Sequence, residues 1–166
     1  MLIRLITALC LILTAACGQE AAVESAGEAA SRPQPAAAEP AASAEAPLGR
    51  RPAPPGAMAY IVEPADGATV GSPVRVVFGL RGAGVTPAGI EREDAGHHHL
   101  LIDTEPPDFN LPIPADANHV HFGGGQTETE IELSPGRHTL RLLLGDHLHV
   151  PHDPPVMSEP VTIEVR

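Results

Sequence analysis

The sequence contains few of the residue types on which common binding and catalytic sites depend. It has no Trp, one Tyr and three Phe, so it offers few aromatic platforms on which a glycan could stack. It has no Lys and a formal net charge of −11, and such a surface repels phosphate backbones. We therefore expect no nucleic-acid partner. No GxSxG segment is present that could carry a hydrolase nucleophile.

The N-terminal residues have the pattern of a bacterial secretory signal. Arg4 precedes an apolar run that is too short to span a membrane, and small residues follow. The segment ending at Cys17 resembles a lipobox, although Thr14 stands where Leu or Val is usual, and plain cleavage is the alternative. The resemblance implies that residues 1–16 are removed and that Cys17 is acylated. We expect a lipoprotein of the bacterial cell envelope, anchored to a membrane and facing the periplasm or the cell exterior.

Residues 17–57 are expected to form the lipid anchor and a disordered linker. Ala, Pro, Glu and Ser dominate this region, as in "RPQPAAAEPAASAEAP", and hardly any branched or aromatic side chain is available for packing. The folded domain then occupies residues 58–166. It contains all nine histidines, and its six Arg against sixteen Asp and Glu give a formal charge of −10. That acidity favours cations as ligands.

Short segments of alternating apolar and polar residues predict strands throughout the domain. For example, "VRVVFGL" places Val74, Val76 and Phe78 on one face, and no segment offers a long amphipathic helix. The pattern predicts an all-β fold, an immunoglobulin-like antiparallel β-sandwich of about seven strands. The predicted strands lie in residues 58–64, 74–80, 97–103, 119–122, 127–133, 138–144 and 161–165.

Several longer motifs resemble known bacterial domains. "PADGATVGSPVRVVFGL" looks like the opening of bacterial immunoglobulin-like domains, and "LSPGRHTLRLLL" with the final "VTIEV" looks like their last two strands. The series "GHHHLLIDT", "PIPADANHVHFGGGQTE" and "PGRHTLRLLLGDHLHVPHD" is similar to the family called domain of unknown function 4399. This resemblance supports the limits of the domain and implies no substrate.

Two histidine pairs in predicted strands are candidate metal ligands. Residues two apart on a strand point to the same side, about 6.5 to 7 Å apart along the chain. His119 and His121 therefore share a face opposite Val120 and Phe122, and His97 and His99 share a face with Asp103. We expect Asp103 to be a ligand or to orient a metal-bound imidazole. His98 points the other way, and we expect it in the core, donating to a backbone carbonyl.

The segment "GDHLHVPHDPP" supplies three further candidate ligands, His147, His149 and His152. Its prolines stiffen the loop and so lower the cost of ordering it. The alternative is that these imidazoles close the end of the sandwich by hydrogen bonds to the loop backbone. His138, at the start of a late strand, is expected to be structural.

The donor set predicts which metals could bind. Cys10 leaves with the signal and Cys17 carries lipid, so no thiolate remains, and imidazoles with carboxylates suit copper or zinc. We interpret the chain as a metal-binding envelope protein for buffering or delivery. One alternative is a metal-free envelope interaction module with structural histidines and a protein partner. The other is a superoxide dismutase-like metalloenzyme, because "HVHFGG" faintly resembles a segment of that family.

Overall fold

The structure, a computed structural model, describes residues 49–166 and contains strands, turns and loops there. The expected signal peptide, the lipid anchor at Cys17 and linker residues 17–48 lie outside the described residues. Within the described range no helix is long and apolar enough to cross a membrane. The strands are β1 (Met58–Glu63), β2 (Thr69–Val70), β3 (Val74–Arg81), β4 (Gly84–Val85), β5 (Ala95–Ile102), β6 (His119–His121), β7 (Glu128–Ile131), β8 (Gly136–Gly145) and β9 (Val161–Val165).

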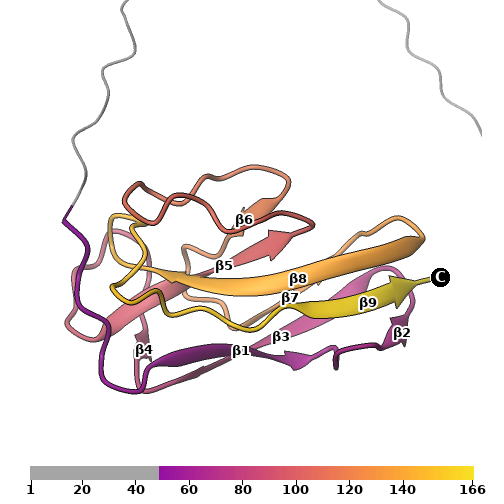
Figure 1. Cartoon of the computed structure of the whole chain (residues 1–166), viewed down its shortest axis with the longest axis horizontal. Coiled ribbons are helices and arrows are strands. Elements are labelled where there is room, and N and C mark those ends of the chain that lie inside the picture. Colours follow the sequence, from indigo (N-terminus) through magenta and orange to yellow (C-terminus); the bar gives the residue numbers. More distant parts are fainter. Residues whose placement is uncertain (1–48) are drawn as a thin grey trace, which may run out of the picture. The chain divides into compact units, whose positions relative to one another are not determined.

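The strands form two sheets packed face to face, which confirms the predicted sandwich. One sheet has the order β1-β3-β7 and the other the order β2-β9-β8-β5-β4, with β6 also paired to β5. Figure 1 shows β5, β8 and β9 in one layer and β1 and β3 in the other. The chain switches sheets between β1 and β2, and β2 then pairs in parallel with the last strand. Two facing sheets of mainly antiparallel strands are the architecture of an immunoglobulin-like sandwich.

The seven predicted strands are all present, and two short strands were not predicted. β2 and β4 have two residues each, and both pair in parallel with their neighbours, whereas the other pairings are antiparallel. Two residues are too few for an alternating pattern to be recognised in a sequence. The sandwich is therefore antiparallel except at these two short pairs.

The main core lies between the two sheets and follows the predicted alternation. Val76 and Phe78 of β3 face Leu140, Leu142 and Leu144 of β8, and these side chains are buried. β5 and β8 are buried on their outer face as well. There Leu101, Ile113 and Leu143 form a second, smaller cluster, with Phe109 and Met157 packed against it.

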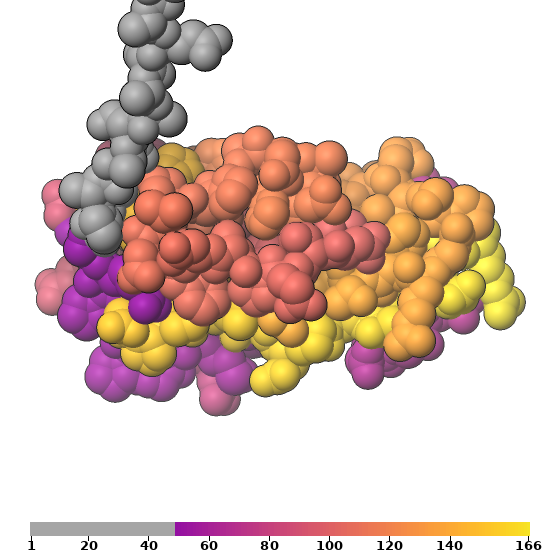
Figure 2. Space-filling model, turned by 45° about the horizontal axis from the view of Figure 1, so that its top comes forward, coloured from indigo at the N-terminus to yellow at the C-terminus, as the bar shows by residue number. Residues whose placement is uncertain are grey.

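Two loop segments cover the outer face of the larger sheet. Ile113 and Phe109 come from the segment between β5 and β6, and Met157 from the segment between β8 and β9. In Figure 2 the salmon and orange atoms of the segment leading to β6 occupy much of this face. Covered in this way, the outer side chains of β5 are removed from water.

Residues 49–57, which the sequence analysis assigned to the linker, contact the domain. Ala53 N–H donates to Asp153 O at 2.8 Å, Asp153 N–H donates to Arg51 O at 2.8 Å, and Pro54 is buried. These hydrogen bonds join the segment before β1 to the loop between β8 and β9.

Truncating a core side chain between the sheets should destabilise the domain. Leu142 is fully buried, so Leu142→Ala is expected to lower the free energy of unfolding by about 2–5 kcal/mol in urea denaturation. Ile90 is 55% exposed, and Ile90→Ala should change it by less than about 0.5 kcal/mol. Equal effects of the two substitutions would contradict the packing described above.

Candidate metal centre

β5 directs its three consecutive histidines to opposite sides of the larger sheet. His98 shares a face with Leu100 and packs on Phe78 of the main core, with ring centroids 5.3 Å apart. His97 and His99 share the other face with Leu101 of the outer cluster. All three imidazoles are fully buried. The period of two residues in a strand is therefore sufficient to separate one core histidine from two outer histidines.

β6 brings a third histidine to the outer pair. In the antiparallel register His121 lies opposite His99, while His119 lies opposite Leu101. The centroid of the His121 ring is 5.1 Å from that of His99 and 5.0 Å from that of His97. His121 itself is exposed, so the group reaches the surface at this point.

A fourth imidazole comes from the loop after β8. The His149 ring centroid lies 4.9 Å from that of His97, 4.8 Å from that of His121 and 5.9 Å from that of His99. His149 has a φ of 68°, in the left-handed region that few non-glycine residues adopt. We call the group formed by His97, His99, His121 and His149 the four-histidine cluster.

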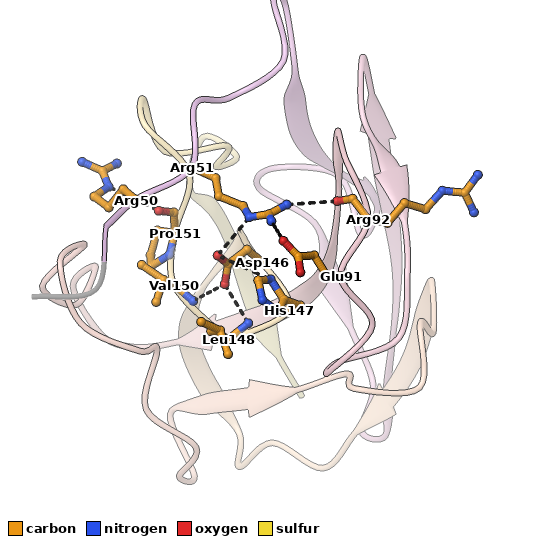
Figure 3. Close-up of polar contacts among 9 residues, drawn as sticks. All are labelled: Arg50, Arg51, Glu91, Arg92, Asp146, His147, Leu148, Val150 and Pro151. Carbon is orange, nitrogen blue, oxygen red and sulfur yellow. Dashed lines mark hydrogen bonds and ion pairs between the residues drawn. The ribbon is translucent and has the colours of Figure 1, made fainter.

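The loop that carries His149 is closed on itself by Asp146. The Oδ1 atom of Asp146 accepts hydrogen bonds from the N–H groups of Leu148 at 2.8 Å and Val150 at 2.9 Å (Figure 3). Backbone hydrogen bonds of 2.9 Å also join Asp146 N to Val150 O and His149 N to Asp146 O. Ile113 N–H donates to His149 O, which ties this loop to the covering segment. The position of His149 is therefore determined by a dense local network.

The spacing of the imidazole nitrogens fits a metal ion. One ligand nitrogen from each of His97, His99 and His121 can be chosen so that the three lie within 4.8 Å of one another. A zinc ion with Zn–N bonds of about 2.0–2.1 Å needs nitrogens roughly 3.4 Å apart in a tetrahedral site. The His149 ring packs against the rings of His97 and His121 beside this group of three nitrogens.

Small residues leave room for these rings. A Cβ atom on Gly145 would lie 2.9 Å from His99 Cε1 and 3.2 Å from Ile113 Cδ1. A Cβ atom on Gly123 would lie 2.4 Å from His121 Cε1. Contacts this short require one of the groups to move. Gly145 and Gly123, which the sequence analysis did not single out, therefore make the space that the cluster occupies.

The buried imidazoles of the cluster are neutral at pH 7. Burial, and then the neighbouring His149 and His121, lower the pKa of His97 to about 4. Burial and the neighbouring imidazoles lower the pKa of His99 to about 2. Burial and His149 also lower the pKa of His121. Neutral imidazole is the form that coordinates a metal.

Both ring nitrogens of His97 and of His99 are buried without a hydrogen-bond partner in the described part of the chain. Each unsatisfied buried donor or acceptor costs about 1–3 kcal/mol. His98 also lacks partners at both nitrogens, so the predicted bond from His98 to a backbone carbonyl is wrong. Its ring contacts Phe78 instead, and burial lowers its pKa to about 4.

Two residues predicted as ligands make other contacts. His119 Nδ1 lies 2.9 Å from Asp116 Oδ1, and this hydrogen bond lowers the pKa of Asp116. Asp103 accepts from Thr139 N–H at 2.7 Å and contacts His138 Nδ1 at 2.7 Å, which raises the pKa of His138. Asp103 orients His138 and no member of the cluster. The strand ends at Ile102, and the φ of 53° at Asp103 breaks the alternation on which our prediction depended.

The remaining candidates, His147 and His152, lie near Asp146. His147 Nδ1 is 3.9 Å from Asp146 Oδ2, and His152 is buried, which lowers its pKa. In the described residues neither ring packs against a ring of the four-histidine cluster. His138 Nε2–H also donates to Ser134 O at 2.8 Å, so this imidazole has partners at both nitrogens.

The fold and the cluster define an immunoglobulin-like sandwich that carries grouped imidazoles on the outer face of its larger sheet. The chain belongs to the family described as domain of unknown function (DUF4399), whose model matches residues 76–166. The match begins within β3 and includes every histidine. No curated protein and no solved structure matches the chain.

The depressed pKa values predict that acid destabilises the metal-free domain. Unfolded histidines, with a pKa near 6.5, take up protons before the buried ones, so stability is present above about pH 6.5 and is lost as the pH falls toward 4. Urea denaturation at pH 7.5 and pH 5 should show a loss on the order of a few kcal/mol. His99→Leu removes one of these groups and should reduce the loss. A free energy of unfolding that is unchanged between the two pH values would contradict the assignment.

Proposed function

We propose that this protein binds a divalent transition metal, copper or zinc, through His97, His99, His121 and His149. The observation that carries the proposal is that His97 and His99, whose buried nitrogens have no hydrogen-bond partner within residues 49–166, converge with His121 and His149. An ion at their centre would satisfy one nitrogen of each ring and would offset the cost of burying it. The other nitrogen of each ring would remain a donor.

The contrast with the other histidines argues against a purely structural role for the cluster. His138 and His119 have the hydrogen bonds to carboxylate or carbonyl oxygens that a structural imidazole requires. In the four-histidine cluster the rings face one another instead. His97 and His99, which have no acceptor within residues 49–166, are poorly placed to hold loops by hydrogen bonds. The metal-free interaction module is therefore the weaker hypothesis.

The ligand atoms limit the choice of metal. The cluster presents imidazole nitrogen only, and this set suits Zn(II) and Cu(II), with copper favoured by the general affinity order. Met157 packs in the outer apolar cluster and Met58 lies near Arg81, so neither thioether joins the site. Cu(I), which prefers sulfur ligands, is disfavoured.

The burial of the ligands supports a role in buffering or delivery. His97 and His99 are fully buried, whereas His121 is exposed and His149 is partly exposed. An ion could therefore enter and leave on the side of His121 and His149 by exchanging two ligands. As part of the same proposal, Cys17 anchors the chain to a membrane of the cell envelope, where an envelope protein could receive the ion.

Metal binding by the full chain, purified without an affinity tag, tests the proposal. After dialysis against equimolar Cu(II) and Zn(II), we expect one bound ion per chain and a higher melting temperature, because a ligand that binds only the folded state stabilises it. Because burial lowers the pKa of His97 to about 4 and that of His99 to about 2, binding should persist at pH 6 and weaken as the pH falls toward 4. A stoichiometry near zero would refute the site. Assay of the copper-loaded chain for superoxide dismutation addresses the enzymatic alternative.

A matched pair of substitutions on β6 separates a ligand from its neighbour. His121→Ala removes a member of the cluster and should weaken metal binding by at least about tenfold. His119→Ala, two residues away on the same strand, removes the bond to Asp116 and should leave the affinity within about twofold. Isothermal titration measures both. If His119→Ala causes the larger loss, the assignment of ligands is wrong.

Gly145→Ala tests the space under His99 without removing a ligand. The added methyl group would lie 2.9 Å from His99 Cε1, so the ring must move. We expect weaker metal binding than in the wild-type chain, together with a fold retained by circular dichroism. A variant that binds metal as tightly as the wild type would show that His99 is free to shift.

A further inference from the structure

The segment before β1 is fastened to the loop that carries His149. We call residues 50–53 the strap. The strap lies outside the part of the chain that matches the family model, residues 76–166. Its backbone forms a parallel bridge between Pro52 and Asp153, with one hydrogen bond of 2.8 Å in each direction. This pairing places two consecutive arginine side chains against residues 146–153.

Arg50 holds the far end of the loop. Its Nε donates to Pro151 O at 3.2 Å, and its guanidinium also donates to His152 O and lies 3.2 Å from Asp153 Oδ1. The same guanidinium lies over the ring of Phe109, 5.7 Å from its centroid. The Arg50 side chain is only 17% exposed. It therefore joins the strap to both segments that cover the larger sheet.

Arg51 approaches the carboxylate that closes the His149 loop. Figure 3 shows its guanidinium between Glu91, Arg92 O and Asp146. Arg51 Nε lies 4.0 Å from Asp146 Oδ2, and the Asp146 side chain is 4% exposed. A carboxylate so deeply buried requires a nearby positive charge and hydrogen-bond donors to offset the loss of water. Arg51 supplies the charge, and the N–H groups of Leu148 and Val150 supply the hydrogen bonds.

We propose that the strap is part of the metal site and that Arg51 is a positioning residue for His149. By stabilising the Asp146 carboxylate, Arg51 holds the loop in the conformation that directs His149 toward His97 and His121. The affinity for metal then depends on residues that precede the family domain and adjoin the linker. This inference rests on the proposed metal-binding function.

Docking of the strap and binding of the metal ion must affect each other by the same free energy. If a docked strap strengthens metal binding, a bound metal strengthens docking of the strap. The peptide bond after Arg50 is a cleavage site for trypsin, so its rate of cleavage reports undocking. We expect trypsin to cleave after Arg50 more slowly in the metal-loaded chain than in the metal-free chain. Mass spectrometry of the fragments measures both rates. An equal rate in both forms would contradict the coupling.

The main test compares the metal affinity of the Arg51→Ala variant with that of the Arg81→Ala variant. Both variants are full-length chains, and each is titrated with Cu(II) or with Zn(II). Both substitutions remove one positive charge, and Arg81 contacts Met58 on the other sheet. We expect Arg51→Ala to weaken binding by about tenfold, as is typical when a partner that orients a ligand is lost. Arg81→Ala should leave affinity within about twofold.

A double-mutant cycle shows whether Arg51 acts through His149. His149→Asn suits the cycle because Asn tolerates the left-handed φ at this position. In the His149→Asn chain, the further substitution Arg51→Ala should weaken binding by less than about twofold, because the ligand that Arg51 positions is already absent. A merely structural role would give the same tenfold loss in both backgrounds.

Should Arg51→Ala fail to fold by circular dichroism, Arg51→Lys provides the comparison. Lysine keeps the positive charge near Asp146 but lacks the planar guanidinium that also donates to Glu91 and Arg92 O. We therefore expect the Arg51→Lys variant to bind metal about threefold more weakly than the wild type. A wild-type chain that binds no metal would overturn the proposed function and this inference together. A wild-type chain that binds metal, with Arg51 variants that bind equally tightly, would overturn the inference alone.

Discussion

The burial of β5 on both of its faces is the constraint on which the rest of the structure depends. One face completes the core between the sheets, and the other lies beneath the segments that contain Ile113 and Met157. In an ordinary sandwich the outer face of such a strand meets water. Here two imidazoles on that face are withdrawn from water. Desolvation keeps them neutral, which is the form of imidazole that can coordinate a metal ion.

The cluster combines a rigid part with an adjustable part. His97 and His99 are held by a central strand that is paired on both sides, and β6 sets His121 opposite His99. His149 belongs to a loop whose shape depends on Asp146 and on contacts with the segment before β1. Stability that differs between strand and loop is a general feature of folded domains. Three imidazoles of the cluster are thus fixed by paired strands, whereas the position of the fourth, His149, depends on loop contacts.

Much of the fold and part of the site could be predicted from the residues alone. Alternation in "VRVVFGL" and "HTLRLLL" identified the core faces, and the parity of His97, His98 and His99 correctly separated the core ring from the outer pair. The same alternation wrongly placed Asp103 beside His97 and His99, because the strand ends one residue earlier and the backbone turns there. It also failed to distinguish His119 from His121, because both share a face and only the neighbouring Asp116 and the register with β5 separate them.

The sequence by itself determined which residues could pair into strands, which histidines shared a side of each strand, and that the described domain would be acidic and free of cysteine. These properties depend on local alternation and on composition. Only the tertiary structure decided which imidazoles meet, because that choice requires the register between β5 and β6 and the path of a loop that begins more than forty residues after β5. The outward burial of β5, and with it the neutral state of His97 and His99, likewise arises from segments distant in sequence that fold over one sheet.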